Sequence, residues 1–277
     1  MNPQDFEFIS TLLKDRSGLV LTPDKSYLLE SRLMPVARKR EMKGLDELIA
    51  HIRSTKQEAL ILEVTEAMTT NESFFFRDIK PFDIFKDTVL PHLIKTRGGG
   101  KSFKIWCAAA SSGQEPYSLS IVLRDAAAKL PGWRTSIVGT DISHDILAKA
   151  KAGVYSQFEV QRGLPIQQLL KYFTKKDEMW EAKQEVRDLV TYKYFNLLND
   201  LTPLGKCDVV FCRNVLIYFD QETKGKVLDQ IAKLLPPDGV LFLGGAETVL
   251  GITEKFKPLA GLRGVYCLSD GVGIPVS

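Results

Sequence analysis

The spacing of hydrophobic residues changes about a quarter of the way along the chain. Before residue 75, apolar side chains recur three and four positions apart, as at Phe6, Ile9, Leu12 and Leu13, which is the spacing of helices that bury one face. Thr22-Pro23-Asp24 resembles a helix start with proline in the first position. The helical pattern continues over 46–53 and 56–68, and no strand is predicted. We therefore expect an all-helical domain over residues 1–75.

The second domain, predicted over residues 76–277, begins with a helix over 82–96. Apolar runs typical of strands then alternate with amphipathic segments typical of helices. Strands are predicted at 103–108, 135–140, 189–196, 207–213, 239–244 and 265–269, and helices at 116–129, 144–152 and 221–235. This alternation predicts an α/β fold with a mostly parallel sheet. The last strand follows a loop rather than a helix, so we expect it to be antiparallel.

The alternation breaks over residues 155–192, a stretch rich in charged and aromatic residues. It could form a small inserted subdomain over the sheet edge or a lid with no special role.

Composition excludes several classes. A net charge of +3 and a pI near 8.5 are too mild to indicate nucleic acid or membrane binding. No apolar run is long enough to span a bilayer, and the acidic amino terminus does not resemble a signal peptide, so a cytoplasmic protein is expected. The four cysteines lack metal-site spacing and are expected to be buried free thiols. No metal is predicted, and His51, His92 and His144 lie outside the motifs below.

The most informative segment is 104–120, KIWCAAASSGQEPYSLS. An apolar strand runs into a turn of small residues, including Ala109 and Gly113, and then into a helix, which predicts a nucleotide-sized pocket. The turn lacks the G-x-G-x-x-G glycines and carries Glu115, which would repel a diphosphate. A carboxylate there suits a cationic ligand with a ribose, and S-adenosylmethionine (SAM) is the common cofactor of that kind.

Two acidic residues have alternative interpretations. Asp141 ends the second predicted strand, where an acidic residue can accept hydrogen bonds from both ribose hydroxyls. It could instead cap the next helix, although Ser143 is better placed to do so. Glu115 begins a helix, where the macrodipole favours a carboxylate in any protein.

Two further segments carry polar residues that a core does not require. In 207–220, CDVVFCRNVLIYFD, an apolar strand leads into Arg213, Asn214 and then Tyr218, at the sheet edge where ligands bind. In 69–78, TTNESFFFRD, the phenylalanines are typical of a core or interface, whereas Asn71, Ser73 and Arg77 are not.

The motifs TNESFFFRD, WCAAASSGQEPYS, GTDIS and FCRNVLIYFD, in this order after a helical module, resemble the CheR family of chemotaxis receptor methyltransferases. The resemblance implies a Rossmann-like SAM-dependent methyltransferase domain that methylates glutamates of chemoreceptors and releases S-adenosylhomocysteine. It also implies cofactor-binding roles at Asn71, Ser73, Arg77, Ala109, Glu115, Asp141, Asn196, Leu197, Arg213 and Asn214. Arg77 and Tyr218 are the implied catalytic residues, placed against the acceptor. Ser73 replaces a common threonine and keeps the hydroxyl.

The implied chemistry agrees with these residue types. A glutamate acceptor, with an ordinary side-chain pKa of about 4.3, is already ionised at neutral pH, so no general base is required. Alignment of the reactants in a dry site supplies the catalysis. Arg77 can orient the acceptor carboxylate, and Tyr218 can donate a hydrogen bond to it.

The helical module contains a basic run at Arg32, Arg38, Lys39, Arg40 and Lys43. The resemblance implies receptor contact there, and a solvated face is the alternative. Tethered members bind a receptor pentapeptide through a glycine-containing loop, whereas residues 171–188 contain no glycine. We therefore expect tether independence. A monomer is the default expectation.

Two other functions stay open at this point. One is SAM-dependent methylation of another acceptor, such as a small carboxylic acid or RNA; the absence of an arginine-rich stripe counts against RNA. The other is a SAM-binding scaffold without catalysis, which would have no use for Arg77 and Tyr218.

Overall fold

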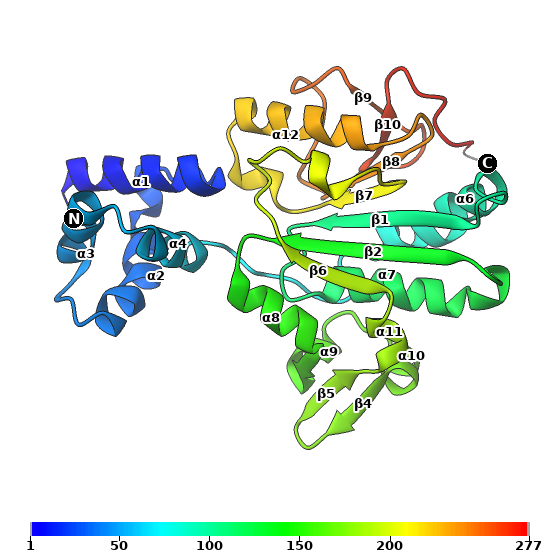
Figure 1. The fold of residues 1–277 in the computed structure, drawn as a ribbon, viewed down its shortest axis with the longest axis horizontal. Coiled ribbons are helices and arrows are strands. Elements are labelled where there is room, and N and C mark those ends of the chain that lie inside the picture. Colours follow the sequence, from blue (N-terminus) through cyan, green and yellow to red (C-terminus); the bar gives the residue numbers. More distant parts are fainter. Residues whose placement is uncertain (1, 276–277) are drawn as a thin grey trace. The chain divides into compact units, whose positions relative to one another are not determined.

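The computed structural model describes residues 2–275, which form two compact units. One unit contains residues 2–70 together with 218–223. The other contains residues 71–217 and 224–275. Both units are drawn in Figure 1.

The first unit is built from four α-helices: α1 (Pro3–Ser17), α2 (Ser26–Lys39), α3 (Leu45–Thr55) and α4 (Glu58–Ala67). Their apolar faces meet in one core that includes Ile9, Leu33 and Ile52. The predicted helices and the lack of strands in these residues are confirmed. Thr22-Pro23-Asp24 differs in detail, because the short 3₁₀ turn η1 (Pro23–Lys25) precedes α2.

A short segment from far along the chain joins this unit. The Val20 N–H donates to the Tyr218 carbonyl at 2.9 Å. Lys14 forms an ion pair with Asp220 at 2.8 Å. These contacts assign residues 218–223 to the helical unit, which the sequence pattern did not predict.

The second unit is organised around a seven-stranded sheet with the order β6-β2-β1-β7-β8-β10-β9. The strands are β1 (Ser102–Ala108), β2 (Arg134–Asp141), β6 (Val190–Tyr194), β7 (Val209–Cys212), β8 (Val240–Leu243), β9 (Phe256–Pro258) and β10 (Val265–Leu268). The central pairings are parallel, and β10 is antiparallel to both of its neighbours. The predicted α/β fold and antiparallel last strand are confirmed, but β9 was missed.

Helices pack against this sheet. They are α5 (Lys80–Ile84), the π-helical η2 (Phe85–Val89), α6 (Leu90–Thr96), α7 (Gln114–Asp125), α8 (His144–Ala152) and α12 (Gln221–Leu234). Short 3₁₀ turns lie at η3 (Ala127–Lys129), η4 (Thr202–Leu204) and η5 (Leu216–Tyr218). Figure 1 shows α7 and α8 beside β2 and β6, and α12 beside β7 and β8. This arrangement gathers the carboxyl ends of β6, β2, β1 and β7 at one edge.

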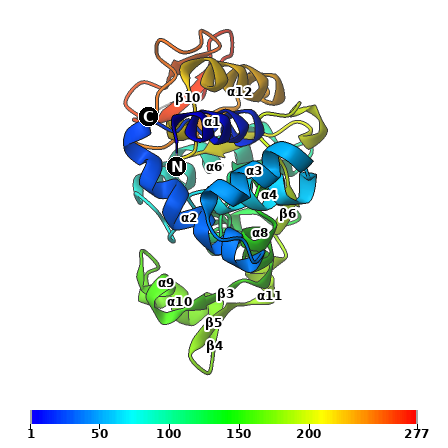
Figure 2. The same cartoon turned by 90° about the vertical axis from the view of Figure 1, so that its left-hand side faces the viewer.

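The segment after α8 forms a small subdomain with its own three-stranded sheet, ordered β3-β5-β4. It comprises β3 (Val154–Ser156), α9 (Gln157–Gln161), α10 (Ile166–Tyr172), β4 (Phe173–Lys176), β5 (Met179–Ala182) and α11 (Gln184–Arg187). Figures 1 and 2 both place it on the β6 side of the large sheet, away from α12.

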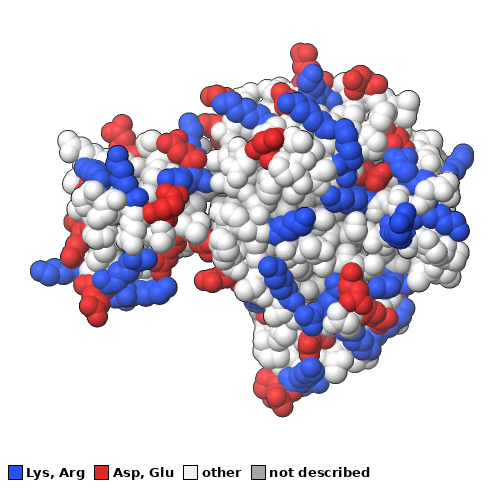
Figure 3. Space-filling model, in the orientation of Figure 1, with Lys and Arg blue, Asp and Glu red and all other residues white. Residues whose placement is uncertain are grey.

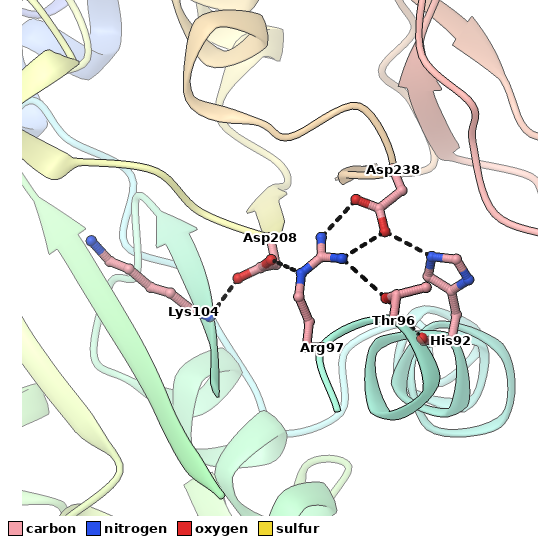
Figure 4. Close-up of polar contacts among 6 residues, drawn as sticks. All are labelled: His92, Thr96, Arg97, Lys104, Asp208 and Asp238. Carbon is pink, nitrogen blue, oxygen red and sulfur yellow. Dashed lines mark hydrogen bonds and ion pairs between the residues drawn. The ribbon is translucent and has the colours of Figure 1, made fainter. Parts of the chain in front are cut away.

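A cluster of charged side chains joins the amino ends of three strands (Figure 4). Arg97, just after α6, bonds Asp208 before β7 at 2.8 Å and Asp238 before β8 at 2.6 Å. Asp208 also accepts from the Lys104 N–H of β1 at 2.9 Å. His92 lies 2.9 Å from Asp238. The cluster fixes α6 to the edge of the sheet opposite the strands' carboxyl ends.

None of the helices formed by residues 2–275 has the length and apolar character needed to cross a membrane. Within the same residues, no group of three or more His, Cys, Asp and Glu side chains is arranged to hold a metal ion. The four cysteines are buried and free, as predicted. On the face drawn in Figure 3, positive and negative side chains are interspersed rather than gathered in a basic stripe.

Candidate functional site

The turn between β1 and α7 lies at the carboxyl edge of the sheet and is built from small residues. Ala109 and Ser111 have φ angles of +54° and +50°, and Gly113 has +91°. A Cβ on Gly113 would lie 2.5 Å from the Tyr192 hydroxyl oxygen, so glycine is required there. Because the side chains are small and closely packed, backbone atoms form the surface of this turn.

Asp141, the last residue of β2, connects this turn to the next one. Its carboxylate accepts from the Ser111 N–H at 2.9 Å and from the Ser143 N–H at 3.1 Å. Ser143 caps α8 by accepting from the Ile146 N–H. The capping role therefore belongs to Ser143, and Asp141 is a buried carboxylate at the edge where the sequence predicts a ribose site.

Arg213, directly after β7, lies between two carboxylates. Its Nη1 donates to Glu115 at 2.7 Å, and its Nη2 donates to Asp78 at 2.6 Å. The Arg213 side chain is 1% exposed and that of Glu115 13% exposed. The structure thus brings together two residues that the sequence predicted from separate motifs, and adds Asp78, for which no role was predicted.

Burial has an electrostatic consequence at this pair. Burial raises the pKa of the Glu115 carboxyl above its usual range, and the charge of Arg213 offsets part of that rise. The Nε of Arg213 is buried and has no hydrogen-bond partner among the described residues. An unpaired buried donor is costly, which makes this atom a candidate contact for a ligand.

The segment from Asn71 to Asp78 is fastened to the same edge. The Asn71 carbonyl accepts from the Ser111 hydroxyl at 3.0 Å, and the Arg77 carbonyl accepts from Arg213 Nη2 at 2.9 Å. The Arg77 guanidinium donates to the Glu72 carbonyl at 3.0 Å. Ser73 is half-buried between these anchor points. Three of the predicted residues therefore share one anchored segment.

The inserted subdomain packs on this segment. Phe75 is fully buried and meets the rings of Tyr155 and Phe173 edge-on, with centroids 5.0 and 5.5 Å away. A Cβ on Gly163 would lie 1.9 Å from the Phe75 carbonyl oxygen. Arg162 bonds Glu72 at 3.1 Å. The subdomain therefore stabilises the position of the segment that carries Asn71, Ser73 and Arg77.

Asn196 and Leu197 follow β6 at the same edge. The Asn196 side-chain oxygen accepts from the Leu198 N–H at 3.0 Å, which forms a tight turn, and Leu197 is buried. Beside this turn, the rings of His144 and Tyr194 stack with centroids 4.2 Å apart.

Tyr218 lies in the segment that belongs to the helical unit. The other predicted site residues belong to the sheet unit.

Glu247, in the loop after β8, was not among the residues predicted from the sequence. Its buried carboxylate accepts hydrogen bonds from the backbone next to Arg213. The available signal was an acidic residue among small ones, GGAET, three residues after the end of a predicted strand.

The chemistry of this edge fits SAM. An acidic side chain at Asp141 suits ribose hydroxyls, Glu115 suits a cationic amine, and the buried, partnerless Nε of Arg213 suits a carboxylate. A sheet of this topology with such an edge defines the class of SAM-dependent methyltransferases.

Comparison with known proteins identifies the family. The family described as "CheR methyltransferase, SAM binding domain" matches residues 71–265, and "CheR methyltransferase, all-alpha domain" matches residues 4–69. The chain belongs to the CheR methyltransferase family, and its SAM-binding domain is the sheet unit.

Similar full-length relatives share this assignment. The chain is 42% identical over 257 residues to chemotaxis protein methyltransferase 1 of Pseudomonas aeruginosa, covering 91% of this chain and 93% of the relative. It is 38% identical over 260 residues to the chemotaxis protein methyltransferase of Vibrio parahaemolyticus, covering 93% and 94%. Identity to the Escherichia coli chemotaxis protein methyltransferase is 33% over 271 residues, covering 95% and 90%.

Proposed function

We propose that this protein transfers the methyl group of SAM to glutamate side chains of chemoreceptors, forming glutamyl methyl esters. The observation that carries the proposal is the hydrogen bond from Arg213 Nη2 to the Arg77 carbonyl at 2.9 Å. It joins the arginine proposed for the cofactor to the backbone of the arginine proposed for the acceptor. Because chemoreceptors present these glutamates inside the cell, the proposed location is the cytoplasm.

The cofactor roles follow the chemistry of each side chain. When bound, SAM supplies an electrophilic methyl group on a sulfonium centre. Asp141 accepts from the ribose hydroxyls, Glu115 faces the ammonium group, and Arg213 and Asn214 hold the methionine carboxylate. The remaining members of the proposed set line the rest of the site: Asn71, Ser73, Arg77, Ala109, Asn196 and Leu197.

The acceptor side needs orientation rather than a base. A glutamate carboxylate has a pKa of about 4.3 in short peptides and arrives ionised. Arg77 directs the carboxylate toward the methyl group, and Tyr218 donates one hydrogen bond to it. A single well-aligned contact leaves the attacking oxygen nucleophilic, whereas a tight grip on both oxygens would stabilise the ground state instead.

The test of this function uses transfer of a radiolabelled methyl group to membranes that contain chemoreceptors. Release of labelled methanol by base identifies an ester. Arg77→Ala should abolish transfer while the circular dichroism spectrum persists. Arg263→Ala, at an exposed arginine outside the site, should behave as wild type. Binding of SAM without any transfer would redirect the search to another acceptor or to a scaffold role.

Tether independence is part of the proposal. The hairpin between β4 and β5 turns through Asp177 and Glu178 and contains no glycine. Lys176 and Glu181 pair across it. Through its contacts with Phe75 and Glu72, the subdomain stabilises the segment that contains them. This structural role does not require binding of a receptor pentapeptide. Calorimetry with a receptor-type pentapeptide should show no binding, and an affinity in the low micromolar range would contradict this.

The basic run of the helical unit is partly neutralised. Arg32 donates to the Met68 carbonyl at 2.6 Å, and Lys39 and Arg40 both bond Glu63 at 2.8 and 2.7 Å. Arg38 and Lys43 are exposed. We therefore assign receptor contact within this run to Arg38 and Lys43. Reversing both charges should raise the receptor KM without changing the Kd for SAM, and Lys175→Glu on the subdomain serves as the control.

A further inference from the structure

Glu247 is a buried carboxylate whose hydrogen bonds all go to backbone. It lies in the loop after β8 and is 9% exposed. Oε2 accepts from the N–H groups of Asn214 at 2.7 Å and Gly244 at 2.6 Å. Oε1 accepts from the N–H groups of Val215 at 2.9 Å and Leu216 at 2.7 Å. These bonds occupy the lone-pair positions of both oxygens, so Glu247 has no acceptor left for a ligand.

The three consecutive donors 214–216 belong to the turn that follows Arg213. Successive backbone N–H groups that converge on one point form a binding site for an anion. Here the anion is part of the protein itself. Asn214 has a φ of +60°, a conformation that non-glycine residues adopt only when the surroundings enforce it. The charge-assisted bonds to Glu247 are the interactions that enforce it.

The neighbouring glycine shows how closely this turn is packed. A Cβ on Gly244 would lie 2.7 Å from Glu247 Oε2 and 2.8 Å from the side-chain nitrogen of Asn214. The adjacent Gly245 has open space at the same position. Glu247, Gly244 and Asn214 therefore form one fitted unit at the carboxyl ends of β7 and β8.

We infer that Glu247 is a positioning residue for SAM binding, acting through the backbone of Asn214 to Leu216. It fixes the direction of the Asn214 side chain and the backbone conformation at Arg213, directly after β7, so that both side chains face the cofactor. The inference rests on the proposed roles of Arg213 and Asn214. Glu247 itself contacts neither cofactor nor acceptor.

Calorimetry with SAM and the full chain tests this inference without receptor. Glu247→Gln keeps the side-chain shape but turns an NH₂ group toward two of the four backbone donors. We expect at least a tenfold rise in the Kd for SAM with a binding stoichiometry near one. A merely structural role would instead lower the stoichiometry, because part of the protein is unfolded, while the Kd of the remainder stays at the wild-type value. A Kd within twofold of wild type would overturn the inference.

A glycine pair provides a second, matched test that does not depend on the folding of the Glu247 variant. Gly244→Ala should raise the Kd for SAM at least fivefold because the new methyl group displaces Glu247 or Asn214. Gly245→Ala should leave the Kd unchanged. Equal affinities for the two variants would contradict the inference. Because both tests read SAM binding alone, they stay informative even if methylation of chemoreceptors fails.

Discussion

Two arginines, each between two carboxylates, lie at opposite edges of the same sheet and are held in different ways. Arg97 at the amino edge bonds Asp208 and Asp238 (Figure 4), and Arg213 at the carboxyl edge bonds Glu115 and Asp78. The Arg97 side chain is 22% exposed and that of Arg213 1% exposed. The two clusters contain the same kinds of residue. They differ in how many nitrogens of the arginine have a hydrogen-bond partner.

At the amino edge, every nitrogen of the Arg97 guanidinium has a hydrogen-bond partner. Nε, Nη1 and Nη2 of Arg97 all donate to oxygen atoms. Asp208 also receives a backbone N–H, and Asp238 also contacts His92. Such a network fixes α6 to the starts of β1, β7 and β8 and leaves no nitrogen of the guanidinium without a partner.

At the carboxyl edge the backbone is strained and the pairing is incomplete. Positive φ angles at non-glycine residues occur in the turns and segments at this edge, at Phe76, Asp78, Ile79, Ala109, Ser111 and Asn214. Each such residue costs of order 1–3 kcal/mol. Strain of this kind together with a partnerless Nε is typical of a site that is completed by a ligand. The contrast predicts that Arg97 contributes to stability and that Arg213 contributes to binding.

The largest expected effect comes from replacing Arg213. Arg213→Ala leaves Glu115 buried without its cation, and removing one partner of a buried pair costs about 3–5 kcal/mol. Urea unfolding measures this loss. Arg213→Lys keeps the charge but loses the planar fork, and we expect a folded protein with at least tenfold weaker SAM binding by calorimetry. Wild-type affinity in this variant would remove Arg213 from the binding site.

Arg97→Ala should separate stability from binding. The Arg97 side chain is 22% exposed, against 1% for Arg213, so water screens the charges left behind and a smaller loss, about 2–4 kcal/mol, is expected. SAM affinity of the folded protein should stay within twofold of wild type, because the cluster is at the other edge. Weakened SAM binding would show that the two edges are coupled.

Two glycines sharpen the comparison of backbone strain. Gly163, packed against the segment of Arg77, has a φ of +86°, and Gly132, before β2 at the amino edge, has +75°. Alanine at Gly132 meets nothing nearer than Lys101 Nζ at 4.0 Å and should cost about 1 kcal/mol. Alanine at Gly163 must also displace the Phe75 carbonyl and should cost about 3 kcal/mol. Equal losses in thermal unfolding would show that the Phe75 contact is not tight.

The pH dependence of stability should have opposite signs at the two edges. Hydrogen bonds from Arg97 lower the pKa of Asp238 from its ordinary 3.8 to about 2. Asp238 therefore contributes about 2 kcal/mol to the free energy of unfolding above about pH 4, and this contribution is lost as the pH falls through 2. The advantage of wild type over Asp238→Asn in urea midpoints should shrink over this window.

Burial raises the pKa of Glu115 instead. The contribution of Glu115 to the free energy of unfolding is complete below its ordinary pKa of 4.5. It is lost as the pH rises through the raised pKa. Relative to Glu115→Gln, wild type should therefore lose stability as the pH rises above 4.5. The same direction of change for both residues would contradict the contrast between the edges.

The elements that the sequence predicted are those with a local signal. The helix over 144–152 matches α8, and the strand over 103–108 matches β1 within a residue, because hydrophobic period is a property of neighbouring residues. The missed strands β3, β4, β5 and β9 have three or four residues each, of which one is buried in each strand, so they carry too few buried positions for a pattern. Their formation depends on pairing with distant partners.

The sequence by itself determined the class of fold and most of the candidate site, because residues after parallel strands must emerge at one edge of the sheet. That placed Asp141, Glu115 and Arg213 in the same region without coordinates. Only the tertiary structure decided the partners: Arg213 pairs with residues 98 and 135 positions away, and Glu247 bonds a turn 31 to 33 positions earlier. Hydrogen bonds require contact within about 3 Å, and such distances arise from the packing of the whole domain.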